Sequence, residues 1–480
     1  GTLTVSMKPS SGGNGDTSSG SSSSNNRDDS VGNQTTSTQR PDEDRPNIPA
    51  EKQNKKLKAD SKGNVTITKS DLSDAIKAAK NDAKKQGNRK NGIAVKIPME
   101  LNQKLDGAQI TLKADMIDTL VRKRVKSFTI GTDQMMDLGF TLDTIKELNR
   151  QTNGDIILKM KNSTVSSGEA KSAIGNRPVY DISLWTVKNN KEIRLTDLNK
   201  KSIRIAIPYV PAKGEQTGNL YALSVDAAGK VQRITKSSYD ADQKAVIFYV
   251  DHPGIYGIGY DAKGANFTDI ANHWAKDNIL FAVSRGLLSG TSETTFSPDD
   301  AMTKGMFIAA LGRLAGVDPA GYQTGTFTDV KADADYAPYV NWAVSKGIVD
   351  GTSDTTFSPD SSITREQMAV IMKNYAAKLG YAVPKTLEAA TFADNENISS
   401  WAKKAVKSMQ QAGVLAGKTN NRFDPKGTAT RAEVAAVLRR FVEIDIDPQT
   451  ANGWTQNDSG EWSYYKNGKQ VKDGLSNDKK

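Results

Sequence analysis

Residues 351–372 read GTSDTTFSPDSSITREQMAVIM, and the spacing of this stretch occurs three times in the chain. Its four markers are Gly351, Phe357, Pro359 and Thr364. They recur 61 positions earlier as Gly290, Phe296, Pro298 and Thr303, and 66 positions later as Gly417, Phe423, Pro425 and Thr430. Because all four residue types recur with the same shift, they indicate an internal repeat.

The segment after each repeated Thr has the apolar period of an amphipathic helix. Its apolar positions are Phe307, Ala310, Leu311 and Leu314 in the first copy, Met368, Ile371, Met372 and Tyr375 in the second, and Val434, Val437, Leu438 and Phe441 in the third. Three equivalent helices with equivalent apolar faces are buried most economically against one another. We therefore expect a mainly helical bundle with three-fold pseudo-symmetry.

The residues at the start of this helix are candidates for binding an anion. Thr364-Arg365-Glu366-Gln367 and Thr430-Arg431-Ala432-Glu433 fit a capping box, whereas the first copy has Thr303-Lys304-Gly305-Met306. Free amides at a helix start attract an anion, and a neighbouring Arg offers a planar fork for a carboxylate. The pattern predicts three anion-binding helix starts, of which the first is less rigid.

These residues resemble the S-layer homology (SLH) domain. The shared pattern is Phe-x-Asp, Trp-Ala, a Gly-x-x-x-Gly loop, Phe-x-Pro and Thr-Arg-Ala-Glu, and three copies cover about 267–444. The resemblance implies a three-pronged spindle that binds secondary cell-wall polysaccharide, often through the carboxylate of a pyruvate-ketal sugar. It also implies an extracellular location at the cell wall or S-layer surface.

The resemblance places polysaccharide-binding residues in grooves between neighbouring repeats. They are the acids Asp269, Asp329 and Asp394, the cations Lys304, Arg365 and Arg431, and the aromatics Trp274 and Trp401. Tyr336 stands one position displaced in the second repeat, so it stays open whether all three grooves bind. Each Asp is also a candidate helix cap, and each Trp is also a candidate core residue.

Composition indicates how the rest of the chain is organised. Residues 1–10 read as the end of an upstream domain, and the Ser/Gly/Asn-rich stretch at 11–62 reads as a flexible linker. Residues 63–262 alternate short strand and helix patterns, which predicts an α+β, β-rich domain, either a sandwich or an open barrel with helical insertions. The repeats then occupy 263–322, 323–387 and 388–447.

The C-terminal segment 448–480 contains aromatic residues spaced like a hairpin. Gly453-Trp454 is followed by Trp462-Ser463-Tyr464-Tyr465 and Gly468. About 453–474 resembles one unit of the choline-binding-type cell-wall repeats. Because that family builds its sites from successive copies, a packing hairpin is an equally good interpretation.

Several function classes are disfavoured by the composition. The 480 residues include no Cys and only two His, His252 and His273, so no catalytic residues, metal ligands or cofactors are expected. No apolar run is long enough to span a bilayer. The net charge of +10 is not gathered into one basic cluster with aromatics, so nucleic acid is not an expected partner, whereas an anionic wall polymer is.

The resemblance therefore implies an anchor that holds a secreted protein on the bacterial wall through acidic, pyruvylated polysaccharide, and the composition leads us to expect that it is non-catalytic. Two alternatives stay open. One is the attachment end of a larger cell-wall-active glycan hydrolase, and the other is a structural protein that self-associates into an S-layer lattice.

Overall fold

The computed structural model describes residues 48–49 and 56–446, together with the strands at 453–456, 462–466 and 469–470. Short gaps fall at 86, 88, 90–91, 102–104, 153, 382, 386 and 388. The upstream end expected at 1–10 and most of the linker expected at 11–62 lie outside the described residues.

The first part of the chain is β-rich and contains two eight-stranded sheets. One sheet has the order β1-β4-β6-β7-β11-β15-β14, with β2 beside β4, and the other has the order β13-β12-β16-β9-β8-β5-β3, with β10 beside β9. The elements are β1 (Ile48–Pro49), β2 (Leu57–Lys58), β3 (Asn64–Ile67), α1 (Lys69–Lys85), β4 (Ile93–Glu100), β5 (Gly107–Leu112), α2 (Ala114–Arg122), β6 (Ser127–Thr132), β7 (Asp137–Thr141), α3 (Leu142–Gln151), β8 (Ile156–Asn162), α4 (Gly168–Ile174), β9 (Val179–Lys188), β10 (Lys191–Leu195), β11 (Ile203–Pro208), β12 (Leu220–Val225), β13 (Val231–Ile234), β14 (Ser237–Asp240), β15 (Ala245–Val250) and β16 (Ile255–Tyr260).

Both sheets share one hydrophobic core with helices α1, α2 and α3. Strands β3, β5 and β9 alternate buried and more exposed side chains, so each of them buries one face. Ile205 and Phe248 come from the first sheet and Ile110 and Leu184 from the second, and all four lie in the same buried cluster. Burial from both sheets and from the helices holds this region together.

This architecture confirms the expected α+β, β-rich region and corrects some details. The two sheets have separate strand orders, so the described residues form two open sheets and not one barrel. Strand β2 pairs in parallel with β4, although its residues were expected to belong to the linker. The reason is that Leu57 opposite Met99 extends the sheet edge, which composition alone does not reveal.

The second part is helical and built from the three repeats. Its helices are α5 (Lys276–Ser284), α6 (Lys304–Leu314), α7 (Ala337–Ser345), α8 (Arg365–Leu379), α9 (Lys403–Gln411) and α10 (Arg431–Ile446). They pack in three pairs: α6 with α7, α8 with α9, and α10 with α5. The second helix of each repeat therefore lies against the first helix of the following repeat, and the last repeat closes on the first.

The apolar faces predicted from the repeat are buried as expected. All twelve predicted positions on α6, α8 and α10 are at most 7% exposed. They belong to a single cluster that also contains residues of α5, α7 and α9. The pseudo-three-fold bundle is confirmed, with shared burial as its driving force.

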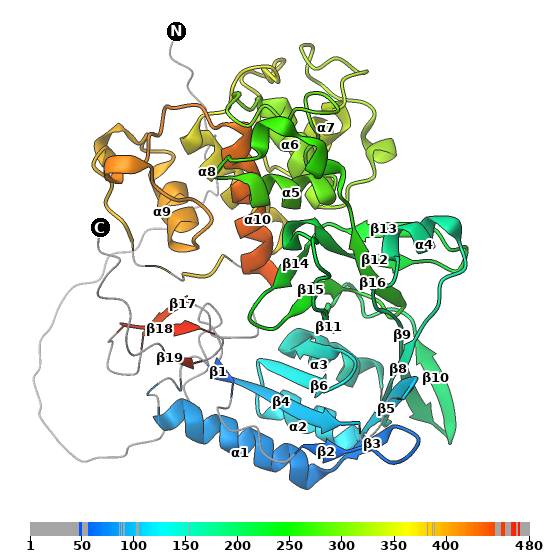
Figure 1. Cartoon of the computed structure of the whole chain (residues 1–480). Coiled ribbons are helices and arrows are strands. Elements are labelled where there is room, and N and C mark those ends of the chain that lie inside the picture. The colour runs from blue at the N-terminus through cyan, green and yellow to red at the C-terminus, as the bar shows by residue number, and fades with distance from the viewer. Residues whose placement is uncertain are drawn as a thin grey trace, which may run out of the picture.

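The two parts are joined through α10 and α5. In Figure 1, α10 extends from the helical part toward β14 and β15, which it contacts. The fully buried Arg285, just after α5, donates to the carbonyls of Ser237 (2.8 Å) and Leu220 (2.6 Å). The Lys236 amine lies 3.4 Å from the Asp445 carboxylate. Polar contacts and a shared core therefore fix the sheets to the repeats.

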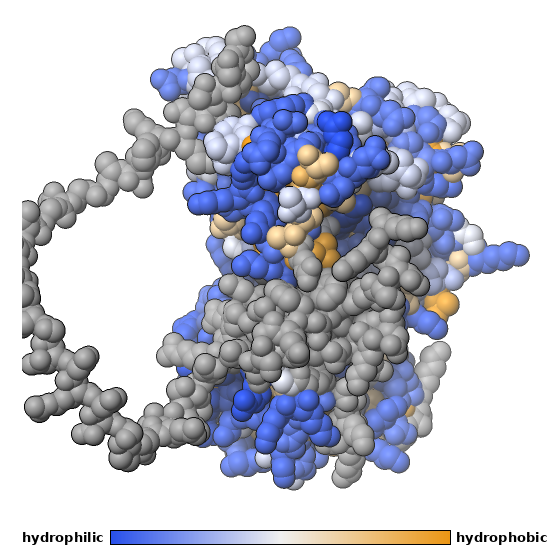
Figure 2. All heavy atoms as spheres, turned by 90° about the vertical axis from the view of Figure 1, so that its left-hand side faces the viewer, coloured by the Kyte–Doolittle hydropathy of each residue, from blue (hydrophilic) through white to orange (hydrophobic). Residues whose placement is uncertain are grey.

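The described surface of the repeats is largely hydrophilic in the view of Figure 2 and carries only small apolar patches. Large exposed apolar side chains in the described residues are Ile193, Val210 and Trp274. At the C-terminal end, strands β17 (Gly453–Gln456), β18 (Trp462–Lys466) and β19 (Lys469–Gln470) form an antiparallel sheet, where the hairpin was expected.

Candidate functional site

The starts of α6, α8 and α10 are joined in a ring of backbone hydrogen bonds. The first two amides of each helix donate to carbonyls that precede the corresponding helix of another repeat. The donor and acceptor pairs are Lys304 to Ser361 (2.9 Å), Gly305 to Pro359 (2.8 Å), Arg365 to Gly427 (3.0 Å), Glu366 to Pro425 (3.1 Å), Arg431 to Asp300 (2.9 Å) and Ala432 to Pro298 (2.9 Å).

The next amide of each helix is also satisfied. The hydroxyls of Thr303, Thr364 and Thr430 accept from the third helical amide at 3.2, 3.3 and 3.2 Å. The capping box predicted for α8 is present, and Glu433 accepts from the Thr430 amide in the same way. The sequence prediction that these helix starts offer free amides to an anion is therefore wrong, because neighbouring repeats occupy them.

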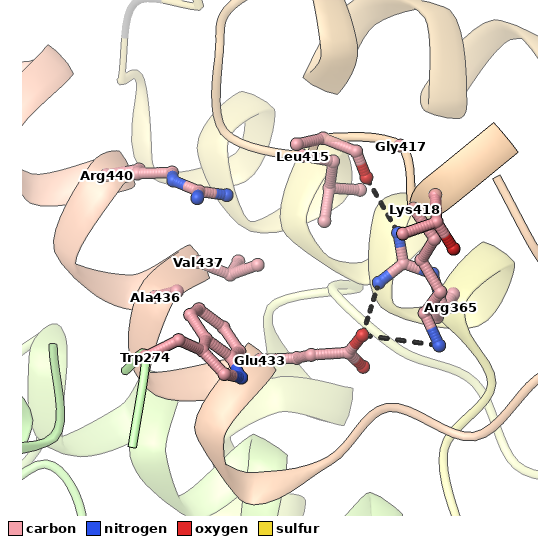
Figure 3. Close-up of a pocket in the computed structure, with 11 residues that line it drawn as sticks. Trp274, Arg365, Leu415, Gly417, Lys418, Glu433, Ala436, Val437 and Arg440 are labelled. Atoms are coloured by element: carbon pink, nitrogen blue, oxygen red, sulfur yellow. Dashed lines mark hydrogen bonds and ion pairs between the residues drawn. The ribbon is translucent and has the colours of Figure 1, made fainter. Parts of the chain in front are cut away.

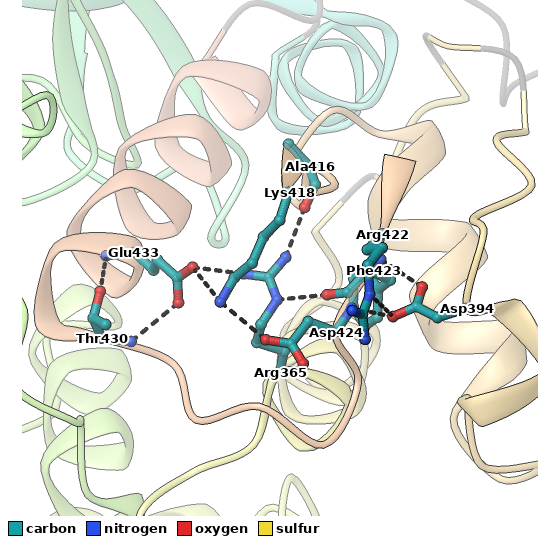
Figure 4. A network of polar contacts seen from close by, with 9 residues as sticks. All are labelled: Arg365, Asp394, Ala416, Lys418, Arg422, Phe423, Asp424, Thr430 and Glu433. Carbon is teal, nitrogen blue, oxygen red and sulfur yellow. Dashed lines mark hydrogen bonds and ion pairs between the residues drawn. The ribbon is translucent and has the colours of Figure 1, made fainter. Parts of the chain in front are cut away.

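Arg365 is directed into the protein. The residue is only 4% exposed. Its side chain donates from Nε to Phe423 O (2.8 Å) and from Nη2 to Ala416 O (2.7 Å). Its Nη1 donates to Glu433 Oε1 at 3.1 Å (Figure 4). All three guanidinium nitrogens therefore hold the second repeat against the third.

Arg431 has the equivalent position between the third and first repeats. It is 4% exposed and donates to Phe296 O (2.9 Å) and Ser289 O (2.5 Å). Burial lowers the pKa of Arg431, although nearby Asp300 and Asp269 act in the opposite direction. Like Arg365, this side chain closes the junction between two repeats.

Lys304 completes the set but makes a different contact. Its amine lies 4.1 Å from the centroid of the Phe357 ring, in a cation–π arrangement. Burial lowers the pKa of Lys304 to about 8, while the Asp329 carboxylate acts against this shift. A buried amine without strong ionic compensation favours its neutral form more than an exposed lysine does.

The three predicted acids hold the Phe-x-Pro turns. Asp269 accepts from the amides of Phe296 and Ser297, Asp329 from those of Phe357 and Ser358, and Asp394 from those of Phe423 and Asp424, with closest distances of 2.7–3.0 Å. The second residue of each turn has a left-handed φ of 55–58°. The acids therefore cap a turn, and not a helix as the alternative interpretation had it. Their ligand role stays a prediction.

The hydrogen bonds from the turn amides also lower the pKa values of Asp269 and Asp394. Burial raises the pKa of Asp269 and Asp394, but the amide donors outweigh it, so each pKa lies below the ordinary value of 3.8. Both carboxylates are consequently ionised at neutral pH. Each stabilises a turn of unusual backbone geometry.

One pocket brings together residues of all three repeats. It has a volume of about 440 Å³ and is lined by Trp274 from the first repeat, Arg365 from the second, and Lys418, Glu433 and Arg440 from the third (Figure 3). Trp274 is 61% exposed, so its ring is available at the mouth. Ala436 and Val437 of α10 supply an apolar side.

Of the predicted site residues, this pocket unites Trp274 and Arg365. Trp401 is half-buried and packs against the helical core, and Asp269, Lys304, Asp329, Asp394 and Arg431 do not line the pocket. The repeat pattern missed Lys418 and Arg440. Lys418 follows the repeated Gly417 where the other copies have Thr291 and Thr352, so this departure from the repeat was the available signal.

Glu433 is engaged at one end of the pocket. Its Oε1 lies 3.1 Å from Arg365 Nη1 and 3.3 Å from Lys418 Nζ. Lys418 also contacts Asp424 at 3.2 Å (Figure 4). This end is a compact ion network in which each charge has a partner.

The described residues give no indication of a metal centre or of a membrane span. No group of three or more His, Cys, Asp or Glu side chains among them is arranged to hold an ion. Within the same residues, no helix combines the length and apolar character needed to cross a bilayer.

Comparison with known proteins finds a family match inside each of the three repeats. The family model described as the S-layer homology domain matches residues 266–305, 326–369 and 391–435. The chain carries three S-layer homology domains. Such domains imply anchoring at the cell wall, binding of a cell-wall polymer and association with the cell surface.

Several curated proteins share this region. An S-layer protein of Bacillus thuringiensis subsp. finitimus is 27% identical over 180 residues, 37% of this chain and 21% of its own length. The exoglucanase XynX of Acetivibrio thermocellus is 35% identical over 182 residues, 38% of this chain and 16% of its own length. These matches are about as long as the three S-layer homology domains.

An amylopullulanase of Thermoanaerobacterium thermosulfurigenes shares more of the chain. It is 28% identical over 334 residues, which is 66% of this chain and 18% of the amylopullulanase. So long a match includes residues before 266, outside the S-layer homology domains. The chain spans about a fifth or less of the length of these three relatives.

Proposed function

We propose that this chain is a non-catalytic anchor that holds a surface protein on the bacterial wall by binding an acidic, pyruvylated secondary wall polysaccharide. The observation that carries the proposal is the pocket between the repeats, which combines an exposed Trp with three cations and one carboxylate. An exposed indole ring suits the apolar face of a sugar, and the excess positive charge suits its acidic group.

The pocket suits reversible binding of a polymer. It is open at Trp274, and its apolar side is formed by the short side chains of Ala436 and Val437. These features leave room for a sugar ring beside α10 without a rearrangement of the helices. Attachment is then non-covalent, and it depends on the ligand's charge.

Co-sedimentation with purified walls tests the proposal. The chain is expected to pellet with untreated walls, and to remain soluble with walls whose ketals have been hydrolysed by mild acid. Trp274→Ala is expected to weaken pelleting by about threefold to tenfold, because it removes the aromatic platform. Ile193→Ala, which removes another exposed apolar side chain from β10, is the matched control and is expected to pellet normally. Equal pelleting on treated and untreated walls rejects the proposal.

A second candidate is that the anchor belongs to a larger glycan hydrolase. The supporting observation is the likeness to an amylopullulanase and an exoglucanase, of which this chain spans 18% and 16%. The anchor itself is expected to release no reducing sugar from glycan substrates. Release that survives removal of contaminating enzymes argues against the non-catalytic assignment.

The likeness to S-layer proteins favours a third candidate, self-association into a surface lattice. Concentrated protein would then form regular arrays in electron micrographs. Monomeric sedimentation at all concentrations argues against it.

A further inference from the structure

The three repeats treat one position on their second helices differently. This position lies ten residues after the repeated Thr and is occupied by Arg313 on α6, Asn374 on α8 and Arg440 on α10. Arg313 donates to Leu287 O at 3.3 Å, and Asn374 donates to Ile348 O at 3.2 Å. Both acceptors follow the glycine after the repeat's first helix, so in two repeats the side chain holds the same loop.

Arg440 lacks this contact. In the part of the chain that the structure describes, its side chain makes no hydrogen bond or ion pair, and it lines the pocket beside Trp274. Figure 3 shows its guanidinium extending from α10 into the pocket and lying apart from the Arg365, Lys418 and Glu433 network. One end of the pocket therefore holds a closed ion network, and the other end holds a guanidinium with no hydrogen-bond or ion-pair partner among the described residues.

The charge balance favours an anion at Arg440. Glu433, the carboxylate among the lining residues, is shared by Arg365 and Lys418. Burial lowers the pKa of Arg440, Glu443 acts in the opposite direction, and the positive charge of Arg365 adds to the lowering. A ligand carboxylate beside Arg440 would accept charge-assisted hydrogen bonds from a guanidinium to which no described side chain offers an acceptor.

We propose that Arg440, and not Arg365, binds the carboxylate of the wall saccharide, and that the junction of the second and third repeats is the one that recognises this negative charge. The inference rests on the proposed function. The sugar ring lies between Trp274 and the apolar side formed by Ala436 and Val437, with its acidic group toward Arg440. Arg365 supports the site from behind, by fixing the loop at Ala416 and the side chain of Glu433.

Calorimetric titration of the full chain with two matched sugars tests the inference. The first is the methyl glycoside of an N-acetylhexosamine that carries a 4,6-linked pyruvate ketal. The second carries an isopropylidene ketal, in which a methyl group replaces the carboxylate. Arg440→Gln is expected to weaken binding of the pyruvate ketal by about tenfold to hundredfold and to leave the weak binding of the neutral ketal unchanged.

Arg313→Gln is the matched control because it alters the equivalent position at another junction. It is expected to keep the pyruvate-ketal affinity within about twofold, and Arg440→Lys is expected to retain most of it. The thermal midpoint of Arg440→Gln is expected to match that of the unaltered chain, since no internal contact is lost.

The outcomes separate the inference from the proposed function. If the unaltered chain binds the pyruvate ketal and Arg440→Gln binds it equally well, or if Arg313→Gln loses as much affinity, the inference is wrong and the proposed function stands. If the unaltered chain does not distinguish the two ketals, the acidic ligand of the proposed function fails as well.

Discussion

Replacement of Arg365 by Ala is expected to destabilise the repeats before it affects any ligand. The side chain makes three hydrogen bonds, to Phe423 O, Ala416 O and Glu433. Removing it leaves the buried carbonyl of Phe423 and the part-buried carbonyl of Ala416 without this donor, and leaves Glu433 with Lys418 as its remaining cation. Loss of one partner from a buried charged network costs about 3–5 kcal/mol, and the individual bonds are not additive.

Urea denaturation followed by tryptophan fluorescence measures this effect. Arg365→Ala is expected to lower the free energy of unfolding of the repeats by about 3–5 kcal/mol. The control is Arg122→Ala, which removes an exposed arginine whose Nε lies 2.7 Å from Asp118. Its expected effect is below about 0.5 kcal/mol, because solvent screens exposed ion pairs.

A supporting role of Arg365 would be refuted by loss of wall binding without loss of stability. Suppose Arg365→Ala unfolds at the same urea concentration as the unaltered chain but no longer sediments with walls. Arg365 would then act on the ligand directly, as the sequence pattern first suggested. Loss of wall binding together with loss of stability would instead agree with a supporting role.

Three further predictions concern other charged groups. Because the pKa of Lys304 in the folded chain is lowered to about 8, the unfolded chain binds a proton at this lysine more tightly than the folded chain does. The unaltered chain is therefore expected to gain stability as the pH rises from about 8 to about 10. Lys304→Met should lose this rise and unfold at higher urea concentration at pH 7. Asp394→Asn is expected to cost about 1–3 kcal/mol at pH 7, and the difference from the unaltered chain should vanish as the pH falls below the lowered pKa of Asp394. Arg285→Met is expected to cost about 3–5 kcal/mol and to expose the segment between β16 and α5 to limited proteolysis, because the buried guanidinium joins the sheets to the repeats.

The repeat spacing predicted most of the helical part correctly. The period of Phe307, Ala310 and Leu311 and its copies identified α6, α8 and α10, and the Thr residues identified their caps. These signals are local, because capping and amphipathic burial depend on residues within one or two helical turns. Pseudo-symmetry then followed from three equivalent faces that had to be buried.

The direction of the arginine side chains was not predictable in the same way. The backbone acceptors of Arg365 lie 51 and 58 positions away, and those of Arg431 lie 135 and 142 positions away. Such distances along the chain carry no periodic signal. The motif therefore indicates that a cation is needed at the helix start, but not whether it contacts a ligand or a neighbouring repeat.

The β-rich part shows a comparable limit. Buried strands such as β12 and β15 are apolar runs, which a local pattern marks as strands. Strands β10 (KEIRL) and β14 (SSYD) give no such signal because their residues are mostly polar. Their pairing with β9 and β15 supplies the backbone hydrogen bonds that stabilise them, and this context is absent from a local pattern.

The ring of helix starts has a consequence for how such a protein can evolve. An open solenoid tolerates the gain or loss of one unit, because each unit touches only its neighbours. Here the third copy donates back to the first through Arg431 N and Ala432 N, so the assembly has no free end to extend. Duplication of a single copy would break this closure, whereas cyclic reordering of the three copies preserves every junction. Changes in affinity are therefore expected to arise by divergence at individual junctions and not by a change in copy number.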